Sequence, residues 1–221
     1  KVAEDTIIMF SSDNGGLSYG VRGKTPRNTG RNSHCWPLNA GKGSAYEGGT
    51  RVPMIVSWAR PNSENPHQKK IPIAAASICD TPNICEDYYP TLCNWAGISD
   101  LLAGREDIDG RDLTADVTGK APKVTQPFLF HYPHVWGPRG PGYEPHSSIR
   151  LGDWEDIYLS QPKRWELYNL KDDLGEVKNM AIIHPERLKE LSDRMKIEHD
   201  RRDAQYPANR ETKEPEPPLW Q

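Results

Sequence analysis

An aspartate and an asparagine lie side by side directly after a short apolar segment of the chain. Asp13 and Asn14 carry hard oxygen atoms, which are the ligands that calcium and magnesium prefer in proteins. Ligands of open α/β sheets bind just beyond the carboxyl ends of strands, and this pair would occupy such a position. Gly15 and Gly16 follow and allow the backbone to turn sharply. The same four residues also fit an ordinary turn, since Asp and Asn before glycine are common turn formers.

A lysine bracketed by glycines forms the second candidate site. It belongs to residues 41–53, which read GKGSAYEGGTRVP. The glycines bring the backbone close to a ligand while Lys42 supplies a point positive charge, which is one way to hold a tetrahedral oxyanion. The segment does not match the phosphate-binding pattern G-x-x-x-x-G-K-[ST]. Taken alone, Lys42 would be more typical of a solvated loop.

The elements around these residues are predicted from hydrophobic patterns. Residues 6–10, TIIMF, form an apolar run without polar alternation, which predicts a strand buried on both faces, as in a parallel sheet. Residues 17–49 lack periodicity and are rich in Gly, Asn, Ser and Arg, so we expect a long functional loop. Two further strands and a helix capped by Gly97 are predicted for residues 52–58, 71–78 and 84–95.

The character of the chain changes after residue 123. Short apolar segments separated by Pro, Gly and Lys predict four antiparallel strands at residues 128–132, 147–151, 154–159 and 165–170. Residues 185–202 have the spacing of an amphipathic helix that begins at Pro185. We therefore expect an α/β domain over residues 1–123 and a small α+β subdomain, an antiparallel sheet plus a helix, over residues 124–221.

Composition excludes several function classes. The 221 residues carry a formal net charge of -3, so nothing favours binding to nucleic acid or to an anionic membrane. No apolar run approaches the ~20 residues of a membrane span. The first residue is Lys1, and the chain is expected to begin inside a domain, with no signal peptide present. None of the four cysteines forms C-x-x-C, and Cys79 and Cys85 could either pair or remain free thiols.

Together, and in this order, the two candidate sites resemble the type I sulfatase family. That family has a strand ending in S-D-N-G and then, after a loop, G-K-G-x-x-x-E-G-G-x-R-V-P, as at residues 12–15 and 41–53. Residues 87–92, DYYPTL, are similar to the family's D-x-x-P-T-L segment. Three further stretches look like bacterial carbohydrate sulfatases and their C-terminal subdomain, and they are residues 130–136, 149–154 and 166–179. The resemblance implies the C-terminal half of such an enzyme, with the rear half of an alkaline-phosphatase-like mixed-sheet sandwich.

The resemblance also implies a chemistry. Sulfatases hydrolyse sulfate esters with a formylglycine nucleophile and a calcium ion, for which magnesium could substitute. Asp13 and Asn14 would then be metal ligands and Lys42 would contact the sulfate. Glu47 and Arg51 would be structural and would tie the loop to the sheet. The substrate is expected to be a sulfated small molecule or glycan.

Two histidines in the resembling stretch are candidates for substrate binding. His131 and His134 are flanked by aromatic residues, which fits a sugar subsite. They also fit a packed junction inside the subdomain, because histidine is intermediate in burial. Aromatic and histidine content at residues 132–136 favours a sulfated sugar over a lipid.

The chain departs from the family pattern in ways that limit what it can do alone. The formylglycine motif C-x-[PA]-x-R is absent, since no arginine follows Cys35 at the required place. The paired aspartates and the early histidine of the family are also absent, and all of these belong to its N-terminal half. Two ligands are too few for calcium, which takes ~6–8 oxygens. We therefore expect this chain alone to be inactive and to need the missing N-terminal half as its partner. Glu155 and Asp156 stand where a lysine usually follows the tryptophan.

Two other functions remain open from the sequence. A phosphatase or phosphonate hydrolase of the same superfamily would commonly carry Asp-His where this chain has Asp13 and Asn14, and histidine suits zinc whereas an amide oxygen suits calcium. A non-catalytic interaction domain of this fold is the third possibility, although Lys42 argues against it. Family members are usually exported, so a periplasmic or secreted protein is expected.

Overall fold

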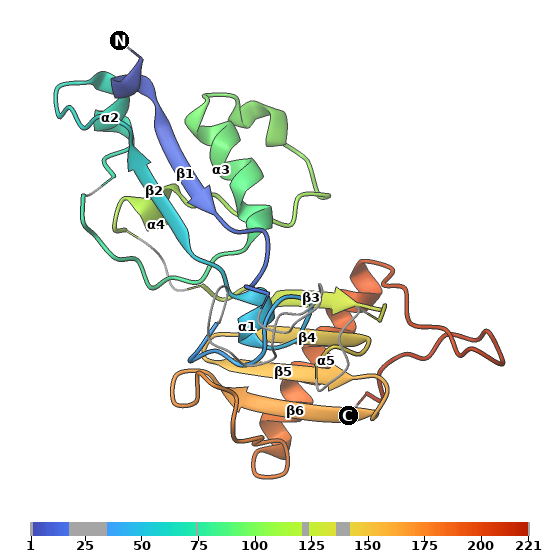
Figure 1. The fold of residues 1–221 in the computed structure, drawn as a ribbon. Coiled ribbons are helices and arrows are strands. Elements are labelled where there is room, and N and C mark those ends of the chain that lie inside the picture. Colours follow the sequence, from blue (N-terminus) through green and yellow to red (C-terminus); the bar gives the residue numbers. More distant parts are fainter. Residues whose placement is uncertain (1, 18–34, 74, 121–123, 136–141, 221) are drawn as a thin grey trace. The chain divides into compact units, whose positions relative to one another are not determined.

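The chain folds into two compact units in the computed structural model (Figure 1). The first unit comprises Lys1–Ser11 with Pro53–Val124, and the second comprises Ser12–Val52 with Thr125–Gln221. The structure describes residues 2–17, 35–73, 75–120, 124–135 and 142–220. The boundary after Val124 lies beside the predicted one, but residues 12–17 and 35–52, which the sequence placed with the first domain, belong to the second unit.

The first unit is built on a two-stranded antiparallel sheet. Strand β1 (Ile7–Ser11) pairs with β2 (Met54–Trp58), with Ile7 opposite Trp58 and Ser11 opposite Met54. Short helices complete this unit: η1 (Ala3–Asp5), α2 (Pro66–Lys70), η2 (Cys85–Asp87), α3 (Tyr88–Trp95), η3 (Ser99–Leu102) and α4 (Thr114–Val117). Gly97 follows α3 with φ +73°, which confirms its predicted place at the helix end.

Burial of β1 differs from the prediction. The strand was expected to be buried on both faces, yet Ile8 and Phe10 are 52% and 56% exposed. Ile55, opposite Phe10 on β2, is 61% exposed. The partner strand is also antiparallel rather than parallel. Both faces of this sheet are apolar, but the described residues of the unit cover only one of them, and an apolar run does not specify what covers it.

The strand predicted at residues 71–78 is wrong for every residue of that range that the structure describes. The segment runs irregularly and turns at Ala76, whose φ of +53° interrupts any extended run. Its start is held by the indole Nε1–H of Trp58, which donates to the Ile71 carbonyl at 2.9 Å. Apolar residues here line a pocket instead of pairing in a sheet.

The second unit contains the predicted antiparallel sheet, in the order β3-β4-β5-β6. Its strands are β3 (Phe128–Tyr132), β4 (His146–Leu151), β5 (Trp154–Leu159) and β6 (Arg164–Asn169), each within one residue of its predicted bounds. Helix α5 (Pro185–Arg201) begins at the expected proline and buries Leu188, Leu191 and Met195 against one face of the sheet.

The other face of this sheet carries the loop that contains Lys42. Successive residues of a strand point to opposite faces, so Asp156 lies with Ile149 and Leu167 on the α5 side. Glu155, by the same alternation, lies with Arg150 on the opposite side. Helix α1 (Glu47–Thr50) packs there, in front of the sheet in Figure 1, while α5 lies behind it.

The C-terminal tail is mostly extended but is anchored at its end. The tail from Ala208 is largely extended, as predicted, with one bridge between Ala208 and Pro215. Trp220 nevertheless packs against the core, with its ring 6.2 Å from that of Trp165. None of the four cysteines forms a disulfide, so the open question of a bond between Cys79 and Cys85 is answered by two thiols.

Candidate active site

The two segments predicted to form a site meet at their backbones. Gly15 N–H donates to the Gly49 carbonyl at 2.8 Å, and Lys42 N–H donates to the Gly16 carbonyl at 2.9 Å. These bonds hold the turn after Asn14 against both ends of the glycine-rich loop. Asp13 is exposed, whereas Asn14 and Lys42 are half-buried, so these side chains are accessible to a ligand. The arrangement places two oxygen ligands and one cation on adjoining backbone.

Close contact between backbone segments explains why Gly15, Gly48 and Gly49 are glycines better than the need for a turn does. A Cβ on Gly15 would lie 1.8 Å from the Gly48 carbonyl oxygen. A Cβ on Gly48 would lie 2.1 Å from the Asn39 carbonyl oxygen, and one on Gly49 would lie 2.3 Å from that of Ser44. The sequence showed these glycines but gave no signal that Gly15 packs against Gly48, since that requires two segments some thirty residues apart to meet.

Glu47 ties the loop to the sheet, as expected from the family resemblance. Its carboxylate accepts hydrogen bonds from Arg51 Nη1 at 2.9 Å and from Arg150 Nη1 at 3.0 Å. Arg150 belongs to β4, so this ion pair joins the loop to the four-stranded sheet. Glu47 is only 2% exposed, and its backbone N–H donates to both carboxyl oxygens of Glu176, at 3.0 and 3.2 Å. The predicted structural role of Glu47 is confirmed, and Arg51 bonds to Glu47 within the loop.

Tyr46 provides a second anchor beside Glu47. Its hydroxyl donates to Glu166 Oε2 at 2.9 Å, and Tyr168 donates to the same oxygen at 2.9 Å. Burial, followed by the Glu166 charge, raises the pKa of both phenols far above its ordinary value. Both hydroxyls therefore remain protonated donors, and the Glu166 carboxylate, also paired with Arg164, holds the loop from the sheet side.

A buried pair of carboxyl groups lies under this anchor and was not identified from the sequence. Glu155 is 1% exposed and Glu176 is 4% exposed. Burial, then the charges of Glu176 and Glu47, raises the pKa of Glu155 well above its usual range. Burial also raises the pKa of Glu176 to about 8. Burial therefore favours the protonated form of both carboxyl groups.

The structure does not bring His131 together with Lys42. Its Nδ1 is hydrogen-bonded to Ser147 Oγ at 2.8 Å and its Nε2 to the Gln205 carbonyl at 2.7 Å. Its ring packs edge-on against His199 at 4.6 Å, and burial lowers its pKa. These contacts lie on the α5 face of the sheet and correspond to a packed junction. His134 is exposed, with its ring 5.7 Å from that of Tyr132.

Asp13 and Asn14 fit a hard divalent cation in donor type but not in number. Their carboxylate and amide oxygens are suitable ligands for calcium or magnesium, which take six or more. Within the described parts of the chain, no three His, Cys, Asp or Glu residues are grouped so that they could hold a metal. A complete site would therefore need further oxygen ligands beyond these two side chains.

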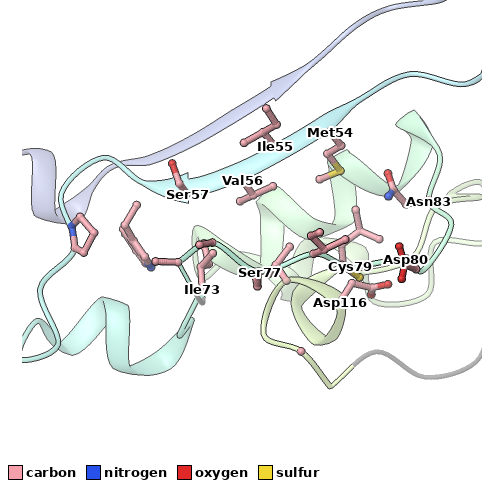
Figure 2. A pocket seen from close by; sticks show the side chains of 18 of the residues that line it. Met54, Ile55, Val56, Ser57, Ile73, Ser77, Cys79, Asp80, Asn83 and Asp116 are labelled. Carbon is pink, nitrogen blue, oxygen red and sulfur yellow. The ribbon is translucent and has the colours of Figure 1, made fainter. Parts of the chain in front are cut away.

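A pocket of about 670 Å³ lies within the first unit, apart from all five predicted site residues (Figure 2). Met54 and Val56 of β2 form one wall, and the segment with Ser77 and Cys79 forms the other. Asp80 and Asp116 are the acids in its lining, and the Asp116 carboxylate is paired with Arg111 at 2.6 and 2.8 Å. The pocket is mainly apolar, and one of its two acids is already paired with an arginine.

Comparison with known proteins identifies the family. Residues 1–98 match the model of the sulfatase family. A sulfatase of Formosa agariphila is 30% identical over 83% of this chain and 30% of its own length. An N-acetylgalactosamine-6-O-sulfatase of Bacteroides thetaiotaomicron is 28% identical over 87% of this chain and 36% of its own length. None of the helices within the described ranges has the length and apolar character that crossing a membrane requires.

Solved structures show the same fold. The crystal structure of Ps i-CgsB in complex with k-i-k-neocarrahexaose matches 94% of this chain with a TM-score of 0.65, at 23% identity, and the match covers 40% of that protein. The predicted alkaline-phosphatase-like α/β fold is confirmed by this likeness. The chain spans about a third of the length of the curated relatives it matches. By its family match and its relatives, this chain belongs to the sulfatase family.

Proposed function

We propose that this chain is part of an enzyme that hydrolyses sulfate esters and that it supplies Lys42, Asp13 and Asn14 to the active site. The observation that carries the proposal is the pair of backbone hydrogen bonds, Gly15 to Gly49 and Lys42 to Gly16. They hold a loop cation beside two oxygen ligands, which is an arrangement suited to a sulfate group bound next to a metal. The family uses a formylglycine and a divalent metal, and calcium is the form that an Asp–Asn pair favours.

Each of the three side chains has a distinct role in this proposal. The Lys42 ammonium binds sulfate oxygens and offsets the negative charge that they gain as the ester bond breaks. Asp13 and Asn14 provide oxygen ligands for the cation, which would supply Lewis-acid stabilisation of the sulfate when bound. The formylglycine nucleophile and the remaining ligands come from a part of the enzyme outside this chain, its expected N-terminal half. The isolated chain is then inactive.

The proposed substrate is a sulfated carbohydrate, and the proposed location is the periplasm or the outside of the cell. Support comes from two similar proteins, one named N-acetylgalactosamine-6-O-sulfatase and one crystallised with k-i-k-neocarrahexaose. Of the two histidines considered for a sugar subsite, His134 is the better candidate, because its side chain is exposed while both ring nitrogens of His131 are already bonded.

The test uses the complete protein that contains this chain. Rates of hydrolysis are compared for an aryl sulfate, an aryl phosphate, a sulfated disaccharide and a steroid sulfate. We expect the sulfates to be cleaved in preference to the phosphate, and the sugar in preference to the steroid. Replacing Lys42 by Ala should lower kcat/KM about 10²–10³-fold. Lys69→Ala, at an exposed lysine of the first unit, is the matched control and should leave kcat/KM unchanged.

Two outcomes would contradict the proposal. Preference for the aryl phosphate would indicate the phosphatase or phosphonate hydrolase of the same superfamily. Absence of all hydrolysis by a metal-loaded protein that carries the modified nucleophile would indicate a non-catalytic interaction domain. Chelation followed by readdition of calcium or magnesium identifies the metal: the proposal expects calcium to restore more activity than magnesium, and Asp13→Ala to raise the calcium concentration required for half-activation.

A further inference from the structure

We propose that Glu166 is a positioning residue for Lys42: its carboxylate binds the hydroxyl of Tyr46 and thereby fixes the orientation of the loop that carries the lysine. The inference rests on the proposed function, since it concerns how the proposed sulfate-binding cation is held. It deepens that function by adding a residue of the four-stranded sheet to the positioning of the site. The sequence predicted no role for Glu166 or Tyr46.

The acceptor is held in place by its own strand. Glu166 is 4% exposed, and all the groups bonded to its carboxyl oxygens are donors, which matches a carboxylate because it only accepts. Arg164 donates to one carboxyl oxygen through Nε at 2.9 Å and through Nη2, and Tyr168 donates to the other at 2.9 Å. Both donors lie two positions from Glu166 on β6 and therefore on the same face of the sheet. Groups other than the loop thus orient the carboxylate.

Tyr46 carries this constraint into the loop. Its hydroxyl donates to the Glu166 oxygen at 2.9 Å, and its ring packs edge-on against Tyr168 at 6.4 Å. A Cβ on Gly142 would lie 2.4 Å from the same ring, so backbone also confines it. The Gly142 carbonyl accepts the N–H of the preceding loop residue, Ala45, at 2.8 Å. Since Lys42 lies only four positions before Tyr46, a shift of the tyrosine displaces the lysine.

Two anchors on different strands fix the orientation of the loop, which one anchor could not. Glu47 is bonded to Arg150 of β4, and Tyr46 is bonded to Glu166 of β6, with β5 between these strands. With the contacts at Glu47 alone, the loop would stay attached to the sheet but could pivot. Loss of the bond to Glu166 should therefore misplace Lys42 without detaching the loop. A misplacement of about 1 Å can lower a rate ~10²-fold.

The first experiment compares steady-state kinetics of aryl sulfate hydrolysis by the complete protein and by two variants that each remove one hydroxyl from the same carboxyl oxygen. Tyr46→Phe removes the donor on the loop and should lower kcat about 10-fold with KM within about twofold, because the Lys42 charge acts on the transition state. Tyr168→Phe, the matched variant, removes the donor on the sheet, and its loss of kcat should be about fivefold smaller. Equal losses of kcat would overturn the inference.

A second variant tests the acceptor itself. Glu166→Gln keeps the size of the side chain, and Arg164, which is 51% exposed, can turn to solvent. The variant should lower kcat about 10-fold, as Tyr46→Phe does, and combining the two should lower it no more than about twofold further, because both remove the same contact. Losses that multiply to about 100-fold would contradict action of Glu166 through Tyr46.

Hydrogen–deuterium exchange in the peptide of residues 41–49 provides a readout that requires no activity. Tyr46→Phe should speed exchange about fivefold, as expected for one lost hydrogen bond, and Tyr168→Phe should speed it less. Unchanged exchange in Tyr46→Phe would show that Glu166 does not hold the loop. If wild type cleaves no sulfate ester, the proposed function fails and the positioning role fails with it. If wild type is active and Tyr46→Phe keeps its kcat, the positioning role alone fails.

Discussion

Two neighbouring acids on strand β5 point to opposite faces of the sheet and have different surroundings. Glu155 and Asp156 are adjacent, and they are 1% and 0% exposed. Glu155 faces the Lys42 loop, where the charges of Glu176 and Glu47 act on it and Arg150 lies opposite on β4. Asp156 faces the apolar core under α5, where no other side chain bonds to it within the described ranges.

Burying each of these acids costs stability, but only at Glu155 do the surrounding groups also hold the candidate loop. Burial raises the pKa of both acids well above their usual range. For Asp156 the only opposing influence is the backbone N–H of Ile157, so burial of this group lowers stability without any structural return. For Glu155 the neighbouring groups form an anchor for the loop. Two equally buried acids on one strand therefore differ in their structural role, because different groups surround them on the two faces.

The largest effect is expected from breaking the ion pair on the face of the sheet that carries the Lys42 loop. Replacing Arg150 by Met leaves the Glu47 carboxylate buried without its partner on the sheet, which should lower the free energy of unfolding by about 3–5 kcal/mol. Urea denaturation followed by tryptophan fluorescence measures this change. Arg210→Met, at an exposed arginine of the tail, is the control and should have little effect. A loss below about 1 kcal/mol for Arg150→Met would show that Arg51 alone stabilises Glu47.

A smaller effect of opposite sign is expected on the unpartnered face. Asp156→Leu replaces a buried carboxyl by an apolar group of similar size among Ile149, Leu167 and Leu191. The free energy of unfolding at pH 7 should rise by about 1–3 kcal/mol, because the cost of burying the acid is removed. The same urea titration measures it. Destabilisation by this variant would contradict the prediction, because it would show that Asp156 makes a favourable interaction.

The pH dependence sharpens the comparison further. A folded-state pKa raised above the unfolded value gives stability that is complete below the unfolded pKa and is lost as pH rises toward the folded one. Asp156 has such a raised pKa. The stability advantage of Asp156→Leu over wild type should therefore widen by on the order of 1–2 kcal/mol between pH 5 and pH 8. A difference that is constant over this range would contradict it.

The smallest expected effect concerns acid rather than alkaline conditions. Burial lowers the pKa of His199 to about 4, so this ring contributes stability above about pH 6.5 that is lost as pH falls toward pH 4. His199→Phe keeps the ring contacts with Tyr206 and Trp220 and should flatten this acid decline by about 1 kcal/mol. Thermal unfolding between pH 4 and pH 7 measures it. An unchanged decline would assign the acid sensitivity to another group.

Local pattern determined the four-stranded sheet and the long helix of the second unit. The alternation in β3–β6 and the helical spacing of Leu188, Leu191 and Met195 each depend on residues a few positions apart, so their bounds were predictable to within one residue. Asp13, Asn14 and Lys42 could be named as candidates, because the chemistry that each can do is a property of the side chain itself. The chemical type of a side chain limits which ligands it can bind, and this does not depend on the fold.

Tertiary structure alone decided what surrounds each residue. The irregular path of residues 71–78, the exposure of Ile8 and Phe10, and the packing of His131 under α5 depend on segments distant in sequence. The same holds for Glu155 and Asp156, which the sequence presents as one acidic pair. Which face of a strand meets charge and which meets apolar core is set by the elements that pack on it, and no property of two adjacent residues contains that information.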